Sequence, residues 1–175
     1  MKTLLLLIFT FVPALAMAQT KPLQTVPKVD LNRYLGTWYE IATIPQRFQK
    51  GCTGVTATYS LRPDGKIDVL NQCYKDSLNG KHKQVHGKAW MVDKETNAKL
   101  KVQFFWPFSG AYWVIELDSV GYQYAVVGHP NRNYLWILCR TPKMDQGLYD
   151  GLLARIRDVH GYDISKIKKT LQPSK

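Results

Sequence analysis

Six side chains in this sequence carry groups that could support catalysis or hold a metal ion. They are Glu40, His82, His86, Glu116, His129 and Cys139. His82 and His86 fall on one face of an expected strand, but their separation of about 13 Å is too long for both to bind one metal ion. The sequence also has no Gly-x-Ser-x-Gly elbow and no glycine-rich phosphate loop. We therefore expect no catalytic residue, no metal and no cofactor, and we expect that the protein is not an enzyme.

Glu40 is the reason that catalytic activity remains an alternative. It shares strand parity with Trp38 and so points toward the expected interior, where a carboxylate could act as a base or bind a polar group. We favour a hydrogen-bonded structural carboxylate at this position, because buried polar groups in proteins are nearly always hydrogen-bonded.

The N-terminus has the pattern of a secretory signal peptide. Lys2 precedes an apolar run from Leu4 to Leu15, and two small-x-small cleavage patterns follow at residues 14–18. We expect a signal peptide over residues 1–18 and a single domain over residues 19–175. No cysteine lies near the cleavage site to accept a lipid anchor, so we expect a soluble protein of the periplasm or the exterior, with association with the outer membrane left open.

Export favours a disulfide among the three cysteines. Pairing Leu61 with Ile67 across a tight turn brings Cys52 and Cys73 close enough for a small bulge to join them. We expect this disulfide, which would stabilise the fold by roughly 3 kcal/mol. Cys139 is then a free thiol buried in its strand.

The chain is strongly basic, with 24 lysines and arginines against 13 aspartates and glutamates, a net charge of +11. The basic residues are scattered, and neither a stacking platform nor a basic helix accompanies them, so we do not expect nucleic acid as a partner. A solvated surface explains most of the excess, and peripheral contact with an anionic membrane surface stays open as an alternative.

Alternating apolar and polar residues predict eight short strands joined by short turns. The expected ranges are 38–44, 53–61, 66–74, 83–92, 99–106, 111–118, 121–128 and 134–140. Sequential hairpins without helical crossovers make an antiparallel sheet, and eight such strands close into an up-and-down β-barrel with room for one small ligand. The sequence therefore predicts an all-β fold of this kind.

A different period follows the strands. Leu148, Leu152, Ile156 and Val159 recur at helical spacing, with Asp145 as a candidate N-cap and Gly161 as a stop. We expect a C-terminal α-helix that packs on the outside of the barrel.

Two motifs narrow the fold further. Gly36-Thr37-Trp38-Tyr39 at the first strand resembles the Gly-x-Trp-Tyr signature of lipocalins, and Arg140 at the end of the last strand resembles the arginine that those proteins place over the tryptophan. An indole fills the narrow end of a barrel, and a guanidinium stacks on its face. Gly36, Trp38 and Arg140 are thus expected to be structural.

The resemblance extends over nearly the whole chain after Leu31. Residues 55–61 and 125–140 are similar to the bacterial Blc subgroup of lipocalins, which also resembles apolipoprotein D and the plant temperature-induced lipocalins. It implies a lumen that binds, stores or transports a small hydrophobic ligand in the cell envelope, such as a fatty acid or lysophospholipid, and a monomer or weak dimer.

Strand parity and the resemblance together predict the residues that contact this ligand. The lining is mostly apolar, with Asn71 and Tyr112 expected to bind a polar head group at the mouth. The predicted set is Ala57, Tyr59, Val69, Asn71, Ala89, Met91, Val102, Phe104, Tyr112, Val114, Trp136 and Leu138.

Three other functions stay open from the sequence. They are an enzyme acting on a lipid or isoprenoid, an envelope interaction protein with a filled barrel, and a haem or tetrapyrrole carrier. No histidine falls on a convincing inward position, which disfavours the last.

Overall fold

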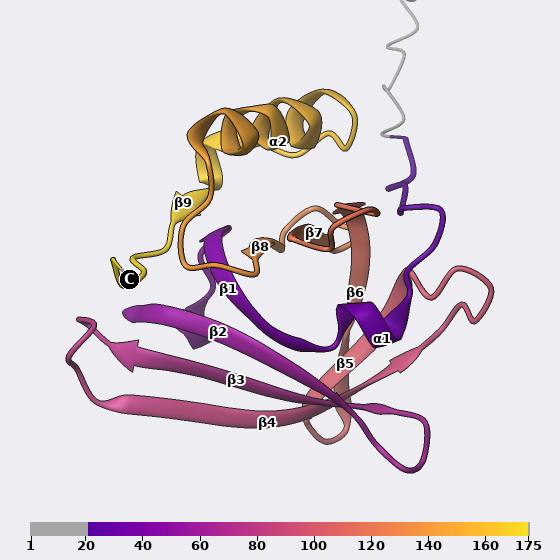
Figure 1. The fold of residues 1–175 in the computed structure, drawn as a ribbon, viewed down its shortest axis with the longest axis horizontal. Coiled ribbons are helices and arrows are strands. Elements are labelled where there is room, and N and C mark those ends of the chain that lie inside the picture. The colour runs from indigo at the N-terminus through magenta and orange to yellow at the C-terminus, as the bar shows by residue number, and fades with distance from the viewer. Residues whose placement is uncertain (1–20, 175) are drawn as a thin grey trace, which may run out of the picture.

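The computed structural model describes residues 21–174, and the expected signal peptide of residues 1–18 lies outside them. The nine strands are β1 (Gly36–Thr43), β2 (Cys52–Leu61), β3 (Ile67–Lys75), β4 (His82–Met91), β5 (Lys99–Phe105), β6 (Phe108–Leu117), β7 (Tyr124–Gly128), β8 (Leu135–Cys139) and β9 (Lys168–Lys169). Strands β1 to β8 follow one another in an antiparallel meander, and β1 pairs with both β2 and β8. This closes the barrel and confirms the predicted fold (Figure 1).

The two ends of the barrel are defined by its turns. The floor carries the β2–β3, β4–β5 and β6–β7 connections, together with the short helix α1 (Leu31–Tyr34) that precedes β1. The mouth carries the other connections, including the β1–β2 loop with its 3₁₀ turn η1 (Arg47–Gln49). Asp30 caps α1, because its carboxylate accepts from the backbone N–H groups of Asn32 and Arg33 at 3.0 and 3.4 Å.

Two strand boundaries differ from the sequence expectation. We expected strands over residues 99–106 and 111–118 with a loop between them, but β6 begins at Phe108 and only Trp106 and Pro107 separate it from β5. Because Pro107 sits in this turn, its missing N–H costs no ladder hydrogen bond and the strands continue on either side.

Strand β7 was expected from residue 121 and begins at Tyr124. The carboxylate of Asp118 accepts from the backbone N–H groups of Val120, Gly121 and Gln123 at 3.2, 2.9 and 3.2 Å. These bonds hold the connection as a compact loop and shorten the strand.

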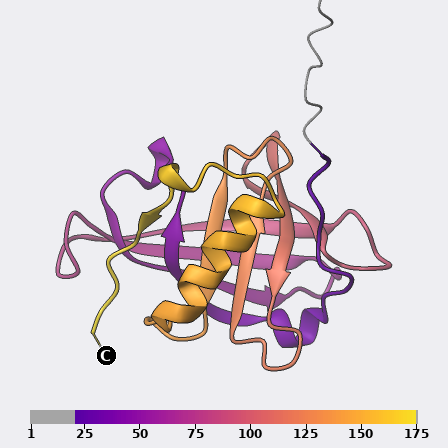
Figure 2. The same cartoon turned by 90° about the horizontal axis from the view of Figure 1, so that it is seen from above.

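Helix α2 (Gln146–Asp158) lies across the outer face of the sheet, as Figure 2 shows. The Asp145 carboxylate caps it by accepting from the N–H of Leu148 at 2.9 Å, as predicted. The buried stripe is Tyr149, Leu152 and Ile156, whereas Val159 is 64 % exposed, so the predicted stripe was wrong at its last position. Val159 is the C-cap residue, directly after the last helical residue Asp158.

The core has two parts that the barrel wall separates. One lies between α2 and the outer face of the sheet, and it includes Leu152, Ile156 and Ile137. The other fills the barrel around Trp38. Within residues 21–174, no helix is long and apolar enough to cross a membrane.

The C-terminal segment completes the barrel wall. Strand β9 pairs with the mouth end of β1 where β1 has left β2, and the N–H of Gly54 in β2 donates to the carbonyl of Leu171 at 2.7 Å. The Gln172 amide then donates to the carbonyls of Glu40 and Val55 at 2.8 and 2.9 Å. The tail therefore bridges the gap between β1 and β2.

Candidate ligand-binding site

The floor of the barrel is sealed by Trp38 and Arg140. Trp38 is fully buried, and its indole N–H donates to the carbonyl of Tyr34 at 2.8 Å. The Arg140 guanidinium lies 3.7 Å from the indole ring centre. Gly36 has φ = 90°, and a side chain here would meet the guanidinium at 3.4 Å, so a glycine suits this position.

Arg140 also holds the chain ends together. It donates to the carbonyls of Arg33, Leu35 and Thr37 at 2.7, 2.9 and 2.9 Å. These acceptors lie in α1 and at the start of β1, so the arginine ties β8 to the chain that covers the floor. All of these acceptors are main-chain groups of the protein.

Three tyrosine hydroxyls form a chain just above Trp38. Tyr112 stands in the middle, with its hydroxyl oxygen 2.8 Å from that of Tyr34 and 2.9 Å from that of Tyr59. Burial raises the pKa of Tyr59 to about 12 and raises the pKa of Tyr34 and Tyr112 still further, so all three hydroxyls stay protonated at neutral pH. Two contacts use two of the three hydroxyl hydrogens, which leaves one to donate to a bound molecule.

The tyrosine chain corrects one sequence expectation. Tyr112 was expected to bind a head group at the mouth, but its hydroxyl lies in the deep half of the barrel. Its ring points from β6 toward Tyr34, which packs on Trp38 with ring centres 5.0 Å apart. Nothing in the sequence indicated that α1 would deliver Tyr34 to this place.

Changing Tyr112 to Phe is expected to cost more stability than changing either neighbour. Tyr112→Phe leaves the two buried hydroxyls of Tyr34 and Tyr59 without a partner, for a loss of about 2–3 kcal/mol in the free energy of unfolding. Tyr59→Phe keeps the other contact and should cost about 1 kcal/mol. Urea unfolding measures both, with the exposed Tyr74→Phe as a neutral control. An equal loss in the two variants would show that Tyr112 is not the centre of the chain.

Above the tyrosines, the structure gathers the other predicted side chains on the inner wall. Most of those near the floor are buried and those toward the mouth are half-buried, and Tyr112 is the exception, because it is half-buried although its hydroxyl lies in the deep half. The buried ones are Tyr59, Val69, Ala89, Val114 and Leu138, and the half-buried ones are Ala57, Val102, Phe104, Tyr112 and Trp136.

Asn71 and Met91 complete the predicted set. Asn71 lies opposite Ala57 in the ladder, and its buried Oδ1 has no hydrogen-bond partner in the protein. Met91 is the last residue of β4, lies opposite Leu100 at the floor end, and does not belong to the interior cluster. Met91 therefore lies apart from the half-buried residues near the mouth.

Gly87 explains how Phe104 fits into the wall. A Cβ at Gly87 would lie 2.6 Å from the Phe104 ring, so the absence of a side chain lets this ring lie across β4. A glycine inside a strand often marks such a close approach.

A polar network connects Trp136 to the C-terminal tail. The Trp136 indole N–H donates to Gln49 Oε1 at 3.1 Å, and Gln49 Nε2 donates to Glu40 Oε2 at 2.8 Å. The Thr170 hydroxyl donates to the second oxygen of Glu40. Burial raises the pKa of Glu40, against the opposing effect of the hydrogen bonds from Thr170 and Gln49. With both oxygens occupied by protein donors, Glu40 has the geometry of a structural carboxylate.

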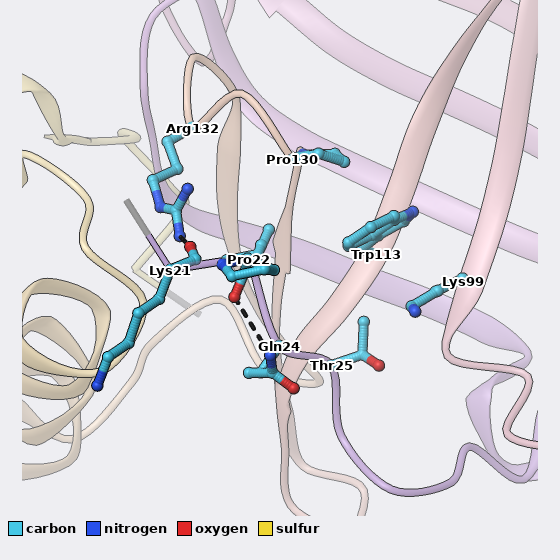
Figure 3. Close-up of a pocket in the computed structure, with 9 residues that line it drawn as sticks. Lys21, Pro22, Gln24, Thr25, Lys99, Trp113, Pro130 and Arg132 are labelled. Atoms are coloured by element: carbon cyan, nitrogen blue, oxygen red, sulfur yellow. Dashed lines mark hydrogen bonds between the residues drawn. The ribbon is translucent and has the colours of Figure 1, made fainter. Parts of the chain in front are cut away.

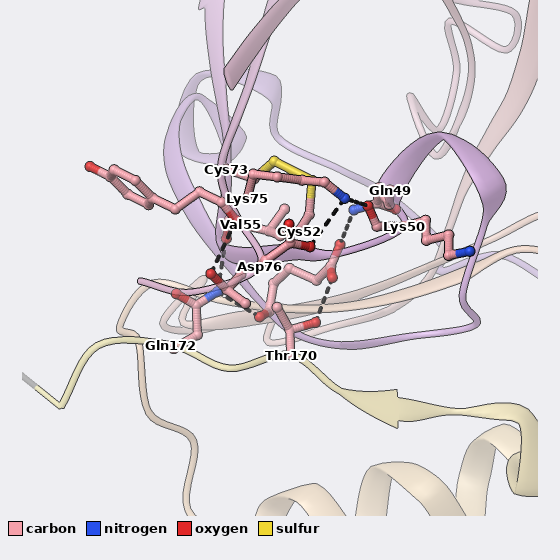
Figure 4. Close-up of a disulfide and its surroundings, with 12 residues drawn as sticks. Gln49, Lys50, Cys52, Val55, Cys73, Lys75, Asp76, Thr170 and Gln172 are labelled. Atoms are coloured by element: carbon pink, nitrogen blue, oxygen red, sulfur yellow. Dashed lines mark hydrogen bonds and ion pairs between the residues drawn. A yellow bond between two sulfur atoms is a disulfide. The ribbon is translucent and has the colours of Figure 1, made fainter. Parts of the chain in front are cut away.

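The sequence analysis missed the partners in this network. Gln49, Thr170 and Gln172 lie in irregular segments, where no periodicity shows which way a side chain points. Figure 4 shows Gln49 and Thr170 in the surroundings of the Cys52–Cys73 disulfide that the sequence predicted. Cys139 is free and buried, as expected.

Two hollows lie outside the lumen. One of about 350 Å³ lies between residues 21–25 and the outer face of β5 and β6, where Lys99 lies over the Trp113 ring (Figure 3). The other, of about 540 Å³, lies at the rim between the β1–β2 loop and the C-terminal tail. Both are open and border basic side chains, whereas the inner wall is mostly apolar.

The other candidate chemical groups are dispersed. His82 and His86 are exposed on β4, and His129 packs on Tyr134. Among residues 21–174, no cluster of three or more histidine, cysteine or acidic side chains could hold a metal ion.

Glu116 anchors helix α2 and lies outside the lumen. Its oxygens lie 2.8 Å from His160 Nε2 and 3.0 Å from Arg155 Nε. Partial burial acts to raise the pKa of Glu116, but the hydrogen bonds from His160 and Arg155 outweigh it and hold the pKa below its usual value. Arg155 and His160 therefore tie the C-terminal part of α2 and the residues after it to the outer face of β6.

Comparison with known families decides what kind of protein has this barrel. A family model described as a lipocalin-like domain matches residues 29–172. The chain belongs to the lipocalin family. Lipocalins bind small hydrophobic ligands, so this lipocalin's apolar lumen is its candidate site.

Several curated relatives support the assignment over most of their length. The outer membrane lipoprotein Blc of Escherichia coli K12 is 47 % identical over 148 residues, which covers 85 % of this lipocalin and 82 % of the relative. Temperature-induced lipocalin-1 of Arabidopsis thaliana is 43 % identical over 165 residues, covering 89 % and 86 %. Apolipoprotein D of Macaca fascicularis is 38 % identical over 149 residues, covering 82 % and 77 %.

Solved structures agree on the fold. Insecticyanin from the tobacco hornworm Manduca sexta superposes with a TM-score of 0.70 at 21 % identity, covering 89 % of this lipocalin and 87 % of insecticyanin. At this identity the likeness concerns the fold alone.

Proposed function

We propose that this lipocalin binds a single-chain lipid, a fatty acid or a lysophospholipid, in its lumen and carries or stores it in the cell envelope. The observation that carries the proposal is the graded inner wall, which is apolar, half-buried toward the mouth and closed at the floor by Trp38 and Arg140. Burial of each CH₂ of an acyl chain contributes about 0.8 kcal/mol, so part of a long chain suffices for micromolar binding.

The polar groups on the wall suit a ligand with one polar end. Asn71 Oδ1 is buried without a partner on the inner wall, and a donor on the ligand or an accompanying water would satisfy it. The mouth carries Arg47, Lys50 and Lys81 in its loops and Lys83 at the start of β4, and these side chains favour an anionic head group there. The role is proposed for the periplasm or the exterior, and as a binding protein without catalytic activity.

The direct test is native mass spectrometry of the purified mature protein, followed by extraction and identification of the lipid. We expect a co-purifying fatty acid or lysophospholipid and titratable uptake of both in the delipidated protein. An empty protein that takes up neither would overturn the proposal and favour a filled barrel.

A pair of variants ties the binding to the lumen. Trp136→Glu puts a charge on the half-buried wall and is expected to weaken fatty-acid binding at least about 100-fold, because a desolvated charge replaces apolar contact. Trp90→Glu makes the same change on the outer face of β4 and should leave binding within about twofold. Val102→Trp, which fills the lumen without adding charge, should also abolish binding. Binding by all three variants is measured by displacement of a fluorescent fatty acid, with a readout that does not use tryptophan fluorescence. Equal binding by Trp136→Glu and Trp90→Glu would contradict the lumen as the site.

A further inference from the structure

Within residues 21–174, the strongly exposed phenylalanine and tryptophan side chains lie at one end of the barrel. Phe48, Phe105, Trp106 and Phe108 are 70, 71, 85 and 77 % exposed, and they are the exposed phenylalanines and tryptophans of residues 21–174. Phe48 lies in η1 of the β1–β2 loop, and the other three lie at the β5–β6 turn. Both segments are at the mouth, on strands well separated around the barrel, so aromatic rings stand on two sides of the lumen entrance.

The charge of the molecule is also divided between its ends. The mouth loops, residues 44–51, 76–81, 106–107 and 129–134, carry four basic side chains and one acidic side chain. The floor segments, residues 30–35, 62–66, 92–98 and 118–123, carry four basic side chains and five acidic side chains. The excess positive charge of the loops is therefore concentrated around the same entrance as the aromatic rings.

From these two observations we infer that the mouth docks on the surface of a bilayer that contains anionic phospholipids. Aromatic side chains prefer the boundary between head groups and acyl chains, and lysines near an anionic surface add electrostatic attraction. Docking in this orientation places the lumen entrance against the lipid. The inference goes beyond ligand binding, because it concerns the surface to which the protein attaches and the face through which it attaches.

The test is sedimentation of the mature protein with vesicles of phosphatidylglycerol and phosphatidylethanolamine, compared with vesicles of phosphatidylcholine. We expect binding to the anionic vesicles that weakens as salt is raised, because salt screens exposed charges. Failure to bind the anionic vesicles, or equal binding to both kinds at all salt concentrations, would overturn the inference.

Matched variants assign the surface. Trp106→Ser/Phe108→Ser should weaken partitioning about tenfold or more, whereas Leu61→Ser/Val120→Ser at the floor should not change it. Lys81→Glu/Lys83→Glu should also weaken it about tenfold or more, whereas Lys94→Glu/Lys101→Glu, away from the mouth, should have a much smaller effect. Equal losses in a mouth variant and its control would show that the protein binds through net charge or general apolarity, with no preferred face.

Two further measurements distinguish docking on the bilayer from ligand uptake and from dimerisation. The filled-lumen variant Val102→Trp should dock like the wild type, since docking uses the rim, and its loss of docking would show that vesicle binding is only ligand uptake. Sedimentation velocity of the wild type should show no dimer whose formation depends on Trp106, as tested with Trp106→Ser. Such a dimer would overturn the inference, because it would mean that a second copy covers the aromatic rings.

Discussion

Replacing Arg140 with alanine is expected to lower the free energy of unfolding by about 3–4 kcal/mol, among the largest effects of any single substitution in this chain. The change removes the guanidinium that lies 3.7 Å over the Trp38 ring and the donors to three carbonyls around α1. Carbonyls that lose a donor in a partly buried place cost about 1 kcal/mol or more each, and the exposed indole face adds to the loss.

Urea unfolding followed by far-ultraviolet circular dichroism measures this effect. Arg140→Lys is expected to recover less than half of it, because an ammonium cannot donate in a planar fork to several acceptors at once. Arg62→Ala serves as the control, since Arg62 pairs with Asp64 and Asp68 at the surface and should cost less than about 1 kcal/mol. If Arg140→Ala were no more destabilising than Arg62→Ala, the floor would not depend on the arginine.

Removing the disulfide in Cys52→Ser/Cys73→Ser is expected to cost about 3 kcal/mol. The bond joins residues 21 apart in sequence and ties the mouth end of β2 to that of β3. Its loss enlarges the conformational freedom of the unfolded chain, and in the folded protein it loosens the rim beside the Glu40 network.

The control for this prediction is Cys139→Ser. The Cys139 thiol lies 3.4 Å from the Thr141 hydroxyl and 3.8 Å from the carbonyl of Lys143, and a serine hydroxyl can use the same partners. We expect a cost of about 1 kcal/mol or less there. Dithiothreitol should bring the wild type down to the stability of the double variant, and a wild type unaffected by the reductant would contradict the prediction.

The parts of the fold that the sequence predicted are those with a regular period. One face of β5 points toward the solvent and the other toward the interior. The apolar residues Leu100, Val102 and Phe104 therefore alternate with lysine and glutamine, and this pattern is visible in the sequence. The Leu61–Ile67 pairing that placed the disulfide is also found in the structure. A two-residue turn around Pro107 was mistaken for a longer loop, since proline marks a break without giving its length.

Strand parity predicted only those site residues that lie in regular strands. Parity placed Trp136 and Tyr59 on the wall, but it carried no information on where the long Tyr112 side chain would end. Gln49 and Thr170 meet Glu40 from segments outside the regular strands, and Tyr34 arrives from a four-residue helix. Such contacts follow from the tertiary path of the chain, which no local pattern contains.

The tail that bridges β1 and β2 also sets the order in which the chain can fold. Thr170 and Glu40 are 130 residues apart in sequence, so the wall of the barrel near the mouth cannot be completed until Thr170 has been synthesised. Contacts between distant residues also form slowly. A chain with this connectivity stays incompletely folded while it emerges from the ribosome, and that is the state in which a protein can be threaded through a narrow translocation pore.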